Sequence, residues 1–429
     1  MAARRRRTGS GGGPGSAQKG AITLFSPTAF RSLFPSLSLT VDGRAAAFFD
    51  GPGGSQVPQS VIDAQSDYYL RANANSHGGF LTSRRTDDVI LRARGAAAAL
   101  LGAAGPQTIS FGQNMTTLNF ALARAIGRTL APGDEIVVTD LDHDANVAPW
   151  LGLAEVGAQL RACPVQLDTC TLDMAALRSL IGPRTRHIAV GYASNAVGTV
   201  NDVAEVIRLG HAVGATVSID AVHFAPHALI DAQALGADFL LCSAYKFFGP
   251  HVGILYSRPG ALDALPTDRV RPQDPAAPTR IETGTLNHAA LAGTTAAIET
   301  IAQAGEGETL RARIVSAFAA IYPYEHGLAR RLWQGLAAIP GVTLYGPPVG
   351  EALRAPTVAF RLQGQAPADV AERLGREGFF VWDGDFYATT LIERLGLADA
   401  GGVVRVGMAP YILESEVDAL LAAVARIAG

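Results

Sequence analysis

Short runs of apolar and β-branched residues alternate with helical apolar spacing through the middle of the chain. Seven runs are typical of strands, at 108–111, 135–139, 159–164, 187–192, 216–219, 239–242 and 253–256. Apolar positions at helical spacing predict helices between them, over 116–130, 146–156, 174–181 and 203–213. This alternation predicts an α/β fold built on a mostly parallel seven-stranded sheet that helices cover on both faces.

The pattern changes in the last third of the chain. Two longer helices are predicted, over 289–304 and 311–339, and four strands follow at 342–345, 357–362, 380–382 and 403–406. Helices over 367–377 and 414–427 separate these strands, which is typical of a smaller α+β domain. We therefore divide the chain into a tail (1–20), an N-terminal segment packing with the small domain (21–48), a large domain (49–305) and a small C-terminal domain (306–429).

Composition and charge exclude several classes of protein. The 429 residues are 48% hydrophobic and 17% charged, as expected for a globular chain of one large or two ordinary domains. A net charge of −3 argues against a nucleic-acid binder, and no apolar run approaches the ~18 residues of a membrane span. Three cysteines without zinc spacing indicate no disulfide framework and no metal site, so a cytoplasmic location is predicted. A Gly/Ser-rich stretch follows Arg4–Arg7 where a signal sequence needs apolar residues, and we expect a disordered tail or a mis-called start.

The basic residues are distributed unevenly between lysine and arginine. Of the 35 basic residues only Lys19 and Lys246 are lysine. Arginine keeps a charge but cannot act as a primary amine, so the one lysine of the globular part is a candidate for amine chemistry. Lys246 follows a predicted strand and lies between aromatic residues, where desolvation would lower its pKa. The ordinary alternative is a lysine that buries its stem and extends its amine to water.

Four further residues follow the ends of predicted strands, where open sheets carry their sites. Thr116 begins a helix whose free N–H groups could bind a phosphate, although an ordinary helix cap explains it too. His143 could stack on a flat ring or move protons, and the ordinary alternative is a solvated loop residue. Asn195 could bind a ligand oxygen, and the ordinary alternative is a turn residue. Asp220 ends a buried strand, so its carboxylate needs a cationic partner.

Together these residues match the needs of one cofactor. Pyridoxal 5′-phosphate requires an amine for a Schiff base, an anion beside its pyridine nitrogen and an anchor for its phosphate ester. Lys246, Asp220 and the helix start at Thr116 would supply these three groups, with His143 against the ring. Pyridoxal 5′-phosphate is therefore the predicted cofactor.

The order of motifs resembles a known family over nearly the whole chain, from about residue 24 to residue 427. The chain is similar to the class V aminotransferases, which are fold-type I pyridoxal-phosphate enzymes, and within them to the cysteine desulfurase-like group. The matching segments are FDGPGGSQV (49–57), FGQNMTT (111–117), DLDHDANVAPW (140–150), SNAVGTV (194–200), DAVHFAPH (220–227), CSAYKFFGPHVG (242–253), ETGTLN (282–287) and VRVGMAPY (404–411).

The resemblance implies a role for each matched residue. Lys246 would hold the cofactor as a Schiff base, Asp220 would pair with the pyridine nitrogen and His143 would stack on the ring. The other cofactor contacts would come from Asn195 and His223 near the ring hydroxyl, from Met115, Thr116, Ser243 and Tyr245 at the phosphate, and from Thr285 of a neighbouring subunit, which implies a homodimer. Arg405 would bind the substrate carboxylate, and His77, Asn75 and Tyr387 would lie at the substrate entrance. Relatives often have Gln at the position of His223 and His at that of Tyr245.

One departure concerns the sulfur chemistry of this group. Cysteine desulfurases pass sulfur to a mobile cysteine, and the resemblance places Tyr387 where that cysteine would be. Cys163 and Cys170 lie far from this loop in the sequence, and Cys242 is predicted to be a core residue. The persulfide route is therefore not expected.

Three interpretations of the function follow, two of them enzymatic and one non-catalytic. The first is an enzyme acting on a small amino acid, either cysteine desulfurase-like or a C–S or β-elimination lyase, without the persulfide cysteine. The second is an amino-acid or peptide epimerase or an aminotransferase of the same fold. The third is a non-catalytic cofactor-binding protein, against which the presence of Lys246, Asp220 and Arg405 argues.

Overall fold

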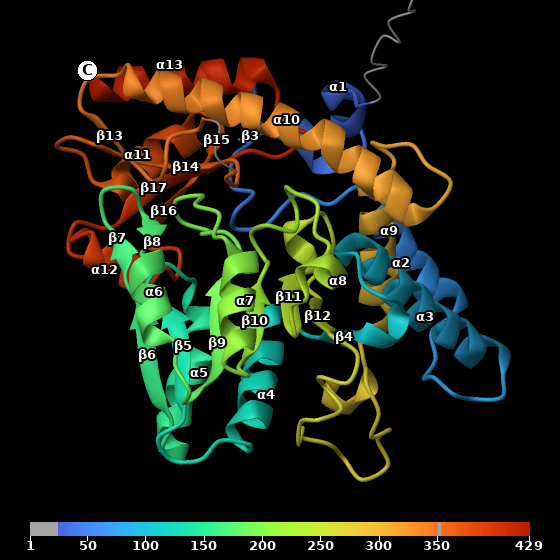
Figure 1. Cartoon of the computed structure of the whole chain (residues 1–429). Coiled ribbons are helices and arrows are strands. Elements are labelled where there is room, and N and C mark those ends of the chain that lie inside the picture. Colours follow the sequence, from blue (N-terminus) through green and yellow to red (C-terminus); the bar gives the residue numbers. More distant parts are fainter. Residues whose placement is uncertain (1–24, 351–352) are drawn as a thin grey trace, which may run out of the picture.

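A computed structural model describes residues 25–350 and 353–429 of the chain (Figure 1). The predicted N-terminal tail, residues 1–20, lies outside the described residues. None of the described helices is long and apolar enough to cross a membrane.

A seven-stranded sheet forms the centre of the larger part. Its strand order is β4-β12-β11-β10-β9-β5-β6, where β12 is antiparallel to both neighbours and the other pairs are parallel. The strands are β4 (Ile109–Gly112), β5 (Glu135–Thr139), β6 (Gln159–Cys163), β9 (Thr185–Gly191), β10 (Thr216–Asp220), β11 (Phe239–Ser243) and β12 (Gly253–Ser257). The predicted fold class, a mostly parallel sheet of seven strands, is confirmed.

Two hydrophobic cores lie on opposite faces of this sheet. Alternate residues of a strand belong to different cores, as in β5, where Val137 lies in one core and Ile136 and Val138 lie in the other. Helices cover the Val137 face with α3 (Leu81–Leu101), α6 (Met174–Leu180), α7 (Val203–Ala212) and α9 (His288–Ala302). The other face is covered by α4 (Met115–Gly127) and α5 (Ala148–Leu151). Strands with apolar residues on both sides are therefore buried on both faces, as parallel sheets require.

The last third of the chain forms a second, smaller sheet. Its order is β13-β14-β17-β16, with all pairs antiparallel, and its strands are β13 (Val342–Tyr345), β14 (Thr357–Leu362), β16 (Trp382–Gly384) and β17 (Val403–Gly407). The helices of this part are α10 (Leu310–Ala337), α11 (Pro367–Arg376), α12 (Thr389–Arg394) and α13 (Glu414–Ala428). Figure 1 shows it beyond the carboxyl ends of the parallel strands. The domain boundaries within the chain stay predictions.

The N-terminal segment lies against this smaller part. Its elements are α1 (Pro27–Arg31), η1 (Pro35–Ser38), the hairpin β1 (Thr40–Val41) and β2 (Arg44–Ala45), and β3 (Ala47–Phe48). Strand β3 pairs in parallel with β15 (Phe379–Phe380), and Arg31 forms an ion pair with Glu416 of α13 at 2.9 Å. The chain then enters the larger part through α2 (Gln59–Arg71).

Two predicted elements are interrupted in the structure. The single helix expected over 146–156 is divided into η3 (Asp144–Asn146), α5 and η4 (Gly152–Val156). Pro149 lies in the first turn of α5 and lacks the N–H that a helix continuing from residue 145 would use. The single strand expected over 380–382 is divided between β15, which pairs with β3, and β16, which pairs with β17.

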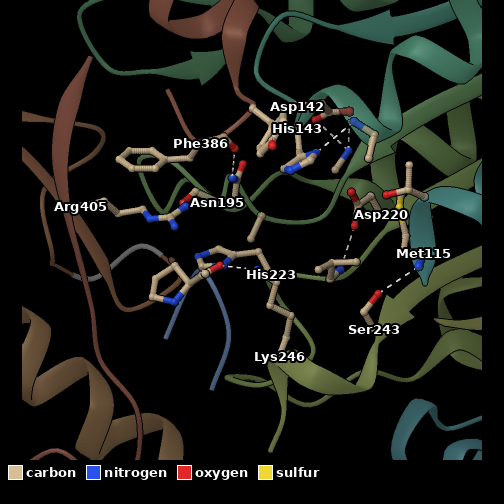
Figure 2. A pocket seen from close by; sticks show the side chains of 18 of the residues that line it. Met115, Asp142, His143, Asn195, Asp220, His223, Ser243, Lys246, Phe386 and Arg405 are labelled. Atoms are coloured by element: carbon tan, nitrogen blue, oxygen red, sulfur yellow. Dashed lines mark hydrogen bonds between the residues drawn. The ribbon is translucent and has the colours of Figure 1, made fainter. Parts of the chain in front are cut away.

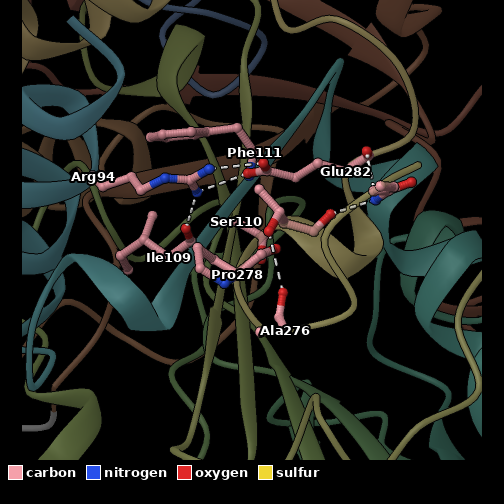
Figure 3. Close-up of polar contacts among 9 residues, drawn as sticks. Arg94, Ile109, Ser110, Phe111, Ala276, Pro278 and Glu282 are labelled. Carbon is pink, nitrogen blue, oxygen red and sulfur yellow. Dashed lines mark hydrogen bonds and ion pairs between the residues drawn. The ribbon is translucent and has the colours of Figure 1, made fainter. Parts of the chain in front are cut away.

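A buried ion pair closes the β4 edge of the large sheet. Arg94 of α3 donates two hydrogen bonds to Glu282, at 2.8 and 2.7 Å, and Glu282 Oε1 also accepts the Phe111 N–H at 2.7 Å (Figure 3). Ser110 Oγ donates to the Pro278 carbonyl at 2.7 Å. Since β4 is an edge strand, Glu282 satisfies the Phe111 N–H that the sheet leaves free, and the Ser110 contact fixes the loop before α9.

Candidate active site

A cavity of about 480 Å³ lies where the strands β5, β9, β10 and β11 end, between the two sheets. Asp142 follows β5, and Gly191, Asp220 and Ser243 end the other three strands. Figure 2 shows side chains from both sheets pointing into this space. The predicted site residues that line it are Met115, Thr116, His143, Asn195, Asp220, His223, Ser243, Tyr245, Lys246, Tyr387 and Arg405.

Lys246 reaches the cavity from η5 (Ala244–Lys246), directly after β11. Its Nζ donates to the Pro52 carbonyl and lies 4.9 Å from the centre of the Tyr245 ring. Burial lowers the pKa of Lys246 to about 7, the positive charge of Arg405 adds to this, and the carboxylate of Asp220 opposes it. A substantial fraction of this amine is therefore unprotonated near neutral pH, as attack on a carbonyl carbon requires.

Asp220 lies at the carboxyl end of β10, buried among the strands. Its Oδ1 accepts the Val222 N–H at 2.9 Å. Burial raises the pKa of Asp220 to about 6, against the lowering effects of the Val222 hydrogen bond and of Lys246. A cation placed against this carboxylate would remove the cost of burying its charge.

His143 and Asp142 lie together in the loop after β5. Both Asp142 oxygens accept the Gly191 N–H at 2.9 Å, and Oδ2 also accepts from Asn146 Nδ2 at 2.8 Å, which fixes the loop to β9. His143 Nδ1 accepts the Ala145 N–H at 3.0 Å. Burial lowers the pKa of His143 to about 4, aided by Lys246 and Arg405, so its ring is neutral near pH 7.

The start of α4 forms another wall of the cavity. Asn114 caps the helix, because its Oδ1 accepts the Thr117 N–H at 2.8 Å, and the Met115 N–H donates to Ser243 Oγ at 3.1 Å. The helix cap is therefore formed by Asn114 with Thr117, and Thr116 lines the cavity instead. Tyr245 lies nearby, with its ring stacked at 4.8 Å on His251. A helix N-terminus with adjacent hydroxyl groups is suited to a phosphate ester.

Arg405 and Asn195 face each other across the junction of the two sheets. Arg405 is 4% exposed, its Nη1 donates to the Asn195 carbonyl at 3.0 Å, and its Nε has no hydrogen-bond partner among the described residues. Asn195 Nδ2 donates to the Phe386 carbonyl at 2.8 Å, while its buried Oδ1 likewise has no partner among them. Burial lowers the pKa of Arg405 to about 9, opposed by Asp50. These two unpartnered atoms leave room for a polar ligand.

Three predicted site residues lie elsewhere in the single chain. His77, Asn75 and Thr285 line a second hollow of about 880 Å³ beside Arg94 and Glu282. Within one chain they do not meet the residues of the first cavity. Their predicted roles stay predictions.

Among the cavity residues that sequence reasoning missed are Asp142, Pro52 and Phe386. Asp142 adjoins His143, but nothing in the sequence distinguishes it from other loop carboxylates. In the structure it lines the cavity, and burial raises its pKa to about 7. Pro52 provides only its carbonyl oxygen to Lys246, which no side-chain pattern reveals. Phe386 places its ring 3.9 Å from the Arg405 guanidinium carbon, a contact that depends on the loop conformation.

The donor set fits pyridoxal 5′-phosphate. A reactive lysine, a buried carboxylate, an unpartnered amide oxygen and a helix start lie on one cavity at the carboxyl ends of a mostly parallel sheet. The fold and the site thus define a pyridoxal-phosphate enzyme of fold-type I.

Comparison with known proteins places the chain within this class. Residues 47–420 match the family described as Aminotransferase class-V, and the chain belongs to that family. It is 36% identical to a "Probable cysteine desulfurase" of Mycolicibacterium paratuberculosis over 94% of this chain, and it spans 58% of that relative's length. It is 34% identical to a "Cysteine desulfurase" of Dickeya dadantii, over 92% of this chain and 95% of the relative.

Solved structures agree with the family. A cysteine desulfurase from Escherichia coli superimposes with a TM-score of 0.80 at 29% identity, covering 94% of this chain and 98% of the other. The apo structure of a cysteine desulfurase from Thermococcus onnurineus gives a TM-score of 0.82 at 27% identity, with the same coverage of both chains. The predicted family, fold and cofactor are confirmed: the protein is a cysteine desulfurase-like, pyridoxal-phosphate-dependent enzyme.

The three cysteines lie outside the cavity. Cys163, Cys170 and Cys242 all lie among the described residues, all are buried, and none lines the cavity. Burial raises the pKa of each thiol, that of Cys163 to about 12. A buried thiol that stays protonated is a poor nucleophile.

Proposed function

We propose that the protein is a lyase that uses pyridoxal phosphate to eliminate a group, sulfur in the first instance, from Cβ of a small amino acid. The observation that carries this proposal is that Lys246, Asp220 and Arg405 line one cavity from which the three cysteines are absent. The first three residues keep the amino-acid chemistry of the family, and the absence of a thiol removes its sulfur acceptor.

The cofactor contacts follow from the cavity walls. Lys246 would bind the aldehyde carbon, Asp220 the pyridine nitrogen and Asn195 the ring hydroxyl. The phosphate would lie against Met115, Thr116, Ser243 and Tyr245, with His143 against the ring. When bound, pyridoxal phosphate supplies an acceptor for the electrons released at the substrate Cα.

The protein's own groups divide the remaining work. Arg405 would bind the substrate carboxylate through its guanidinium, as its buried and partly unpartnered state favours. Lys246, once released from the cofactor, is an amine of lowered pKa that would take the Cα proton. Together these contacts select an α-amino acid and orient its Cα–H bond.

The fate of sulfur separates elimination from desulfuration. The Dickeya relative is named a cysteine desulfurase, so L-cysteine is the natural first substrate to test. A desulfurase transfers sulfur to a thiolate, which becomes a persulfide. Each thiol of this chain is buried and has a raised pKa, so none is a suitable acceptor. Elimination as hydrogen sulfide needs only a proton, so it suits this cavity better.

A homodimer is part of the proposal. The resemblance places Thr285 at the phosphate of a neighbouring subunit, and Thr285 lies outside the first cavity of its own chain. Light scattering of the purified protein tests the dimer. Cofactor retention in Thr285→Val then tests whether that residue contributes to the site.

Product analysis with L-cysteine tests the function. Sulfide, ammonia and pyruvate in equal amounts support the lyase, whereas alanine with sulfur passed to an added thiol indicates a desulfurase. Racemised amino acid or amino-group transfer to a keto acid indicates the epimerase or aminotransferase alternatives. Lys246→Arg keeps the charge but removes the amine, and it should lose both the cofactor's visible absorbance band and all turnover. A wild-type protein without bound cofactor would overturn the proposal.

A further inference from the structure

Two consecutive aromatic residues on the cavity wall adopt left-handed backbone conformations. Phe386 has φ 56° and Tyr387 has φ 59°, in the loop between β16 and α12. A side chain with a Cβ crowds the neighbouring carbonyl in this region, and bulky residues adopt it only when their surroundings enforce it. Such strain clusters at functional sites.

Contacts from the larger part of the chain enforce this conformation. The Phe386 carbonyl accepts from Asn195 Nδ2 at 2.8 Å, and the Tyr387 carbonyl accepts the Asp144 N–H at 2.7 Å. The Tyr387 N–H donates to Asp385 Oδ1 at 3.0 Å within the loop itself. Both strained carbonyls are therefore held by donors from the loops after β9 and β5 of the large sheet.

The conformation gives each aromatic ring a different environment. The Phe386 ring is buried, and its centroid lies 3.9 Å from the Arg405 guanidinium carbon. Figure 2 shows the two side chains next to each other. The Tyr387 ring stacks on His143 with centroids 5.3 Å apart and an interplanar angle of 27°, yet the residue is 69% exposed. Tyr387 is thus fixed in place on the cavity wall while it stays in contact with water.

The two side chains that contact Tyr387 most directly, His143 and Asp385, are poor proton donors. His143 accepts a hydrogen bond at Nδ1 and is neutral near pH 7. Asp385 accepts hydrogen bonds from the Tyr387 N–H and the Thr389 hydroxyl. Tyr387 lines the cavity, and its hydrogen bonds among the described residues are made by its backbone, so the phenol O–H is free to donate to a ligand.

We propose that Tyr387 is a catalytic residue that donates a proton to the group leaving the substrate Cβ. This inference rests on the proposed elimination. The Cα–H bond breaks and its proton goes to the Lys246 amine, while its electron pair forms the Cα–Cβ double bond. The bond from Cβ to the leaving group breaks with its electron pair on the leaving group, which takes the Tyr387 proton. The phenolate regains a proton from water, which its exposed position permits.

The test compares two leaving groups in Tyr387→Phe, which keeps the ring. S-methyl-L-cysteine releases a basic thiolate that needs a proton, whereas β-chloro-L-alanine releases chloride, which does not. We expect the ratio of kcat/KM for the first probe over the second to fall about 100-fold, the size typical of one general acid. An unchanged ratio in a cofactor-loaded variant would overturn the role of Tyr387. A wild-type enzyme that eliminates neither group would instead overturn the proposed elimination itself, and the inference with it.

Tyr387→Gly tests the strain separately. Glycine accepts φ 59° without a clash, so this variant should have a higher melting temperature than wild type and the same reduced ratio as Tyr387→Phe. Asp42→Gly is the matched control, because Asp42 has φ 48° in the β1–β2 turn and does not line the cavity. It should raise the melting temperature and keep the wild-type ratio. A Tyr387→Gly variant with a wild-type ratio would contradict the proposal.

Discussion

The guanidinium carbon of Arg405 lies 3.9 Å from the centre of the Phe386 ring, over its face. Arg405 is almost fully buried, and this ring together with the Asn195 carbonyl replaces water around its charge. A cation held against an aromatic face in a desolvated site gains about 2 kcal/mol. The ring therefore keeps the guanidinium in place before a substrate carboxylate arrives.

Phe386→Leu should weaken substrate binding more than turnover. Loss of the ring contact should raise KM for the amino-acid substrate about tenfold and change kcat little, because the contact exists before and during the reaction. Steady-state kinetics on the cofactor-loaded enzyme give both values. Phe380→Leu is the matched control, since its ring packs at 5.0 Å on Phe48 and does not line the cavity. Equal KM values in the two variants would contradict the role of the ring.

The lowered pKa of Lys246 predicts a pH-dependent stability of the cofactor-free protein. The unfolded chain keeps the lysine proton up to the ordinary pKa of 10.5, whereas the folded chain releases it near 7. Between these values the unfolded state binds more protons, so the free energy of unfolding rises with pH. The raised pKa values of Asp220 and Asp142, about 6 and about 7, act with the opposite sign at lower pH.

Urea unfolding at pH 7.5 and 9.5 measures this effect. The Lys246 contribution should amount to about 2 kcal/mol between these two pH values. Lys246→Met has a similar length and no charge, so it should lack this gain. The difference between the two proteins isolates Lys246 from every other titrating group. An identical pH dependence in both proteins would show that the amine is not desolvated.

The buried pair of Arg94 and Glu282 predicts a large loss of stability on mutation. Glu282→Gln leaves a buried guanidinium without its counter-charge, which should cost about 3–5 kcal/mol of unfolding free energy. Glu372→Gln is the control, because its ion pair with Arg376 is exposed on α11 and should change stability by less than about 1 kcal/mol. Urea unfolding measures both. A small loss in Glu282→Gln would mean that the loop before α9 does not depend on this pair.

Much of this architecture follows from local sequence pattern. The strands β5, β9, β10 and β11 are short, largely buried and rich in β-branched and apolar residues, and their carboxyl ends place His143, Asn195, Asp220 and Lys246 at one edge of the sheet. The scarcity of lysine identifies Lys246 before any fold is known. Apolar spacing and strand ends therefore predict the sheet and four side chains at its carboxyl edge.

Other features depend on contacts between distant segments. Strand β15 forms because β3, more than 300 residues earlier, pairs with it, and no local pattern contains that partner. The α2 and α3 helices lie in a stretch where no element was predicted; in α3 polar Ser83, Thr86 and Arg94 are buried, which obscures its apolar face. The left-handed backbone of Phe386 and Tyr387 is likewise hidden, because their carbonyls are held by Asn195 and Asp144. Sequence reasoning identified Tyr387 as a replacement for cysteine but gave no reason for its fixed position.

At His223, a polar and an apolar replacement should differ in protein stability and in retention of the cofactor. Its Nε2 shares a hydrogen bond of 2.9 Å with Thr357 Oγ1. Burial lowers the pKa of His223 well below the ordinary value, and the charges of His227 and Arg405 lower it further, so the ring is neutral. His223→Gln can keep a hydrogen bond to Thr357 and a polar group in the cavity. His223→Leu leaves the buried Thr357 hydroxyl unpaired and should cost about 1–3 kcal/mol of unfolding free energy. Equilibrium dialysis of pyridoxal phosphate should show tighter retention in the Gln variant than in the Leu variant, and equal retention would mean that His223 makes no polar contact with the cofactor.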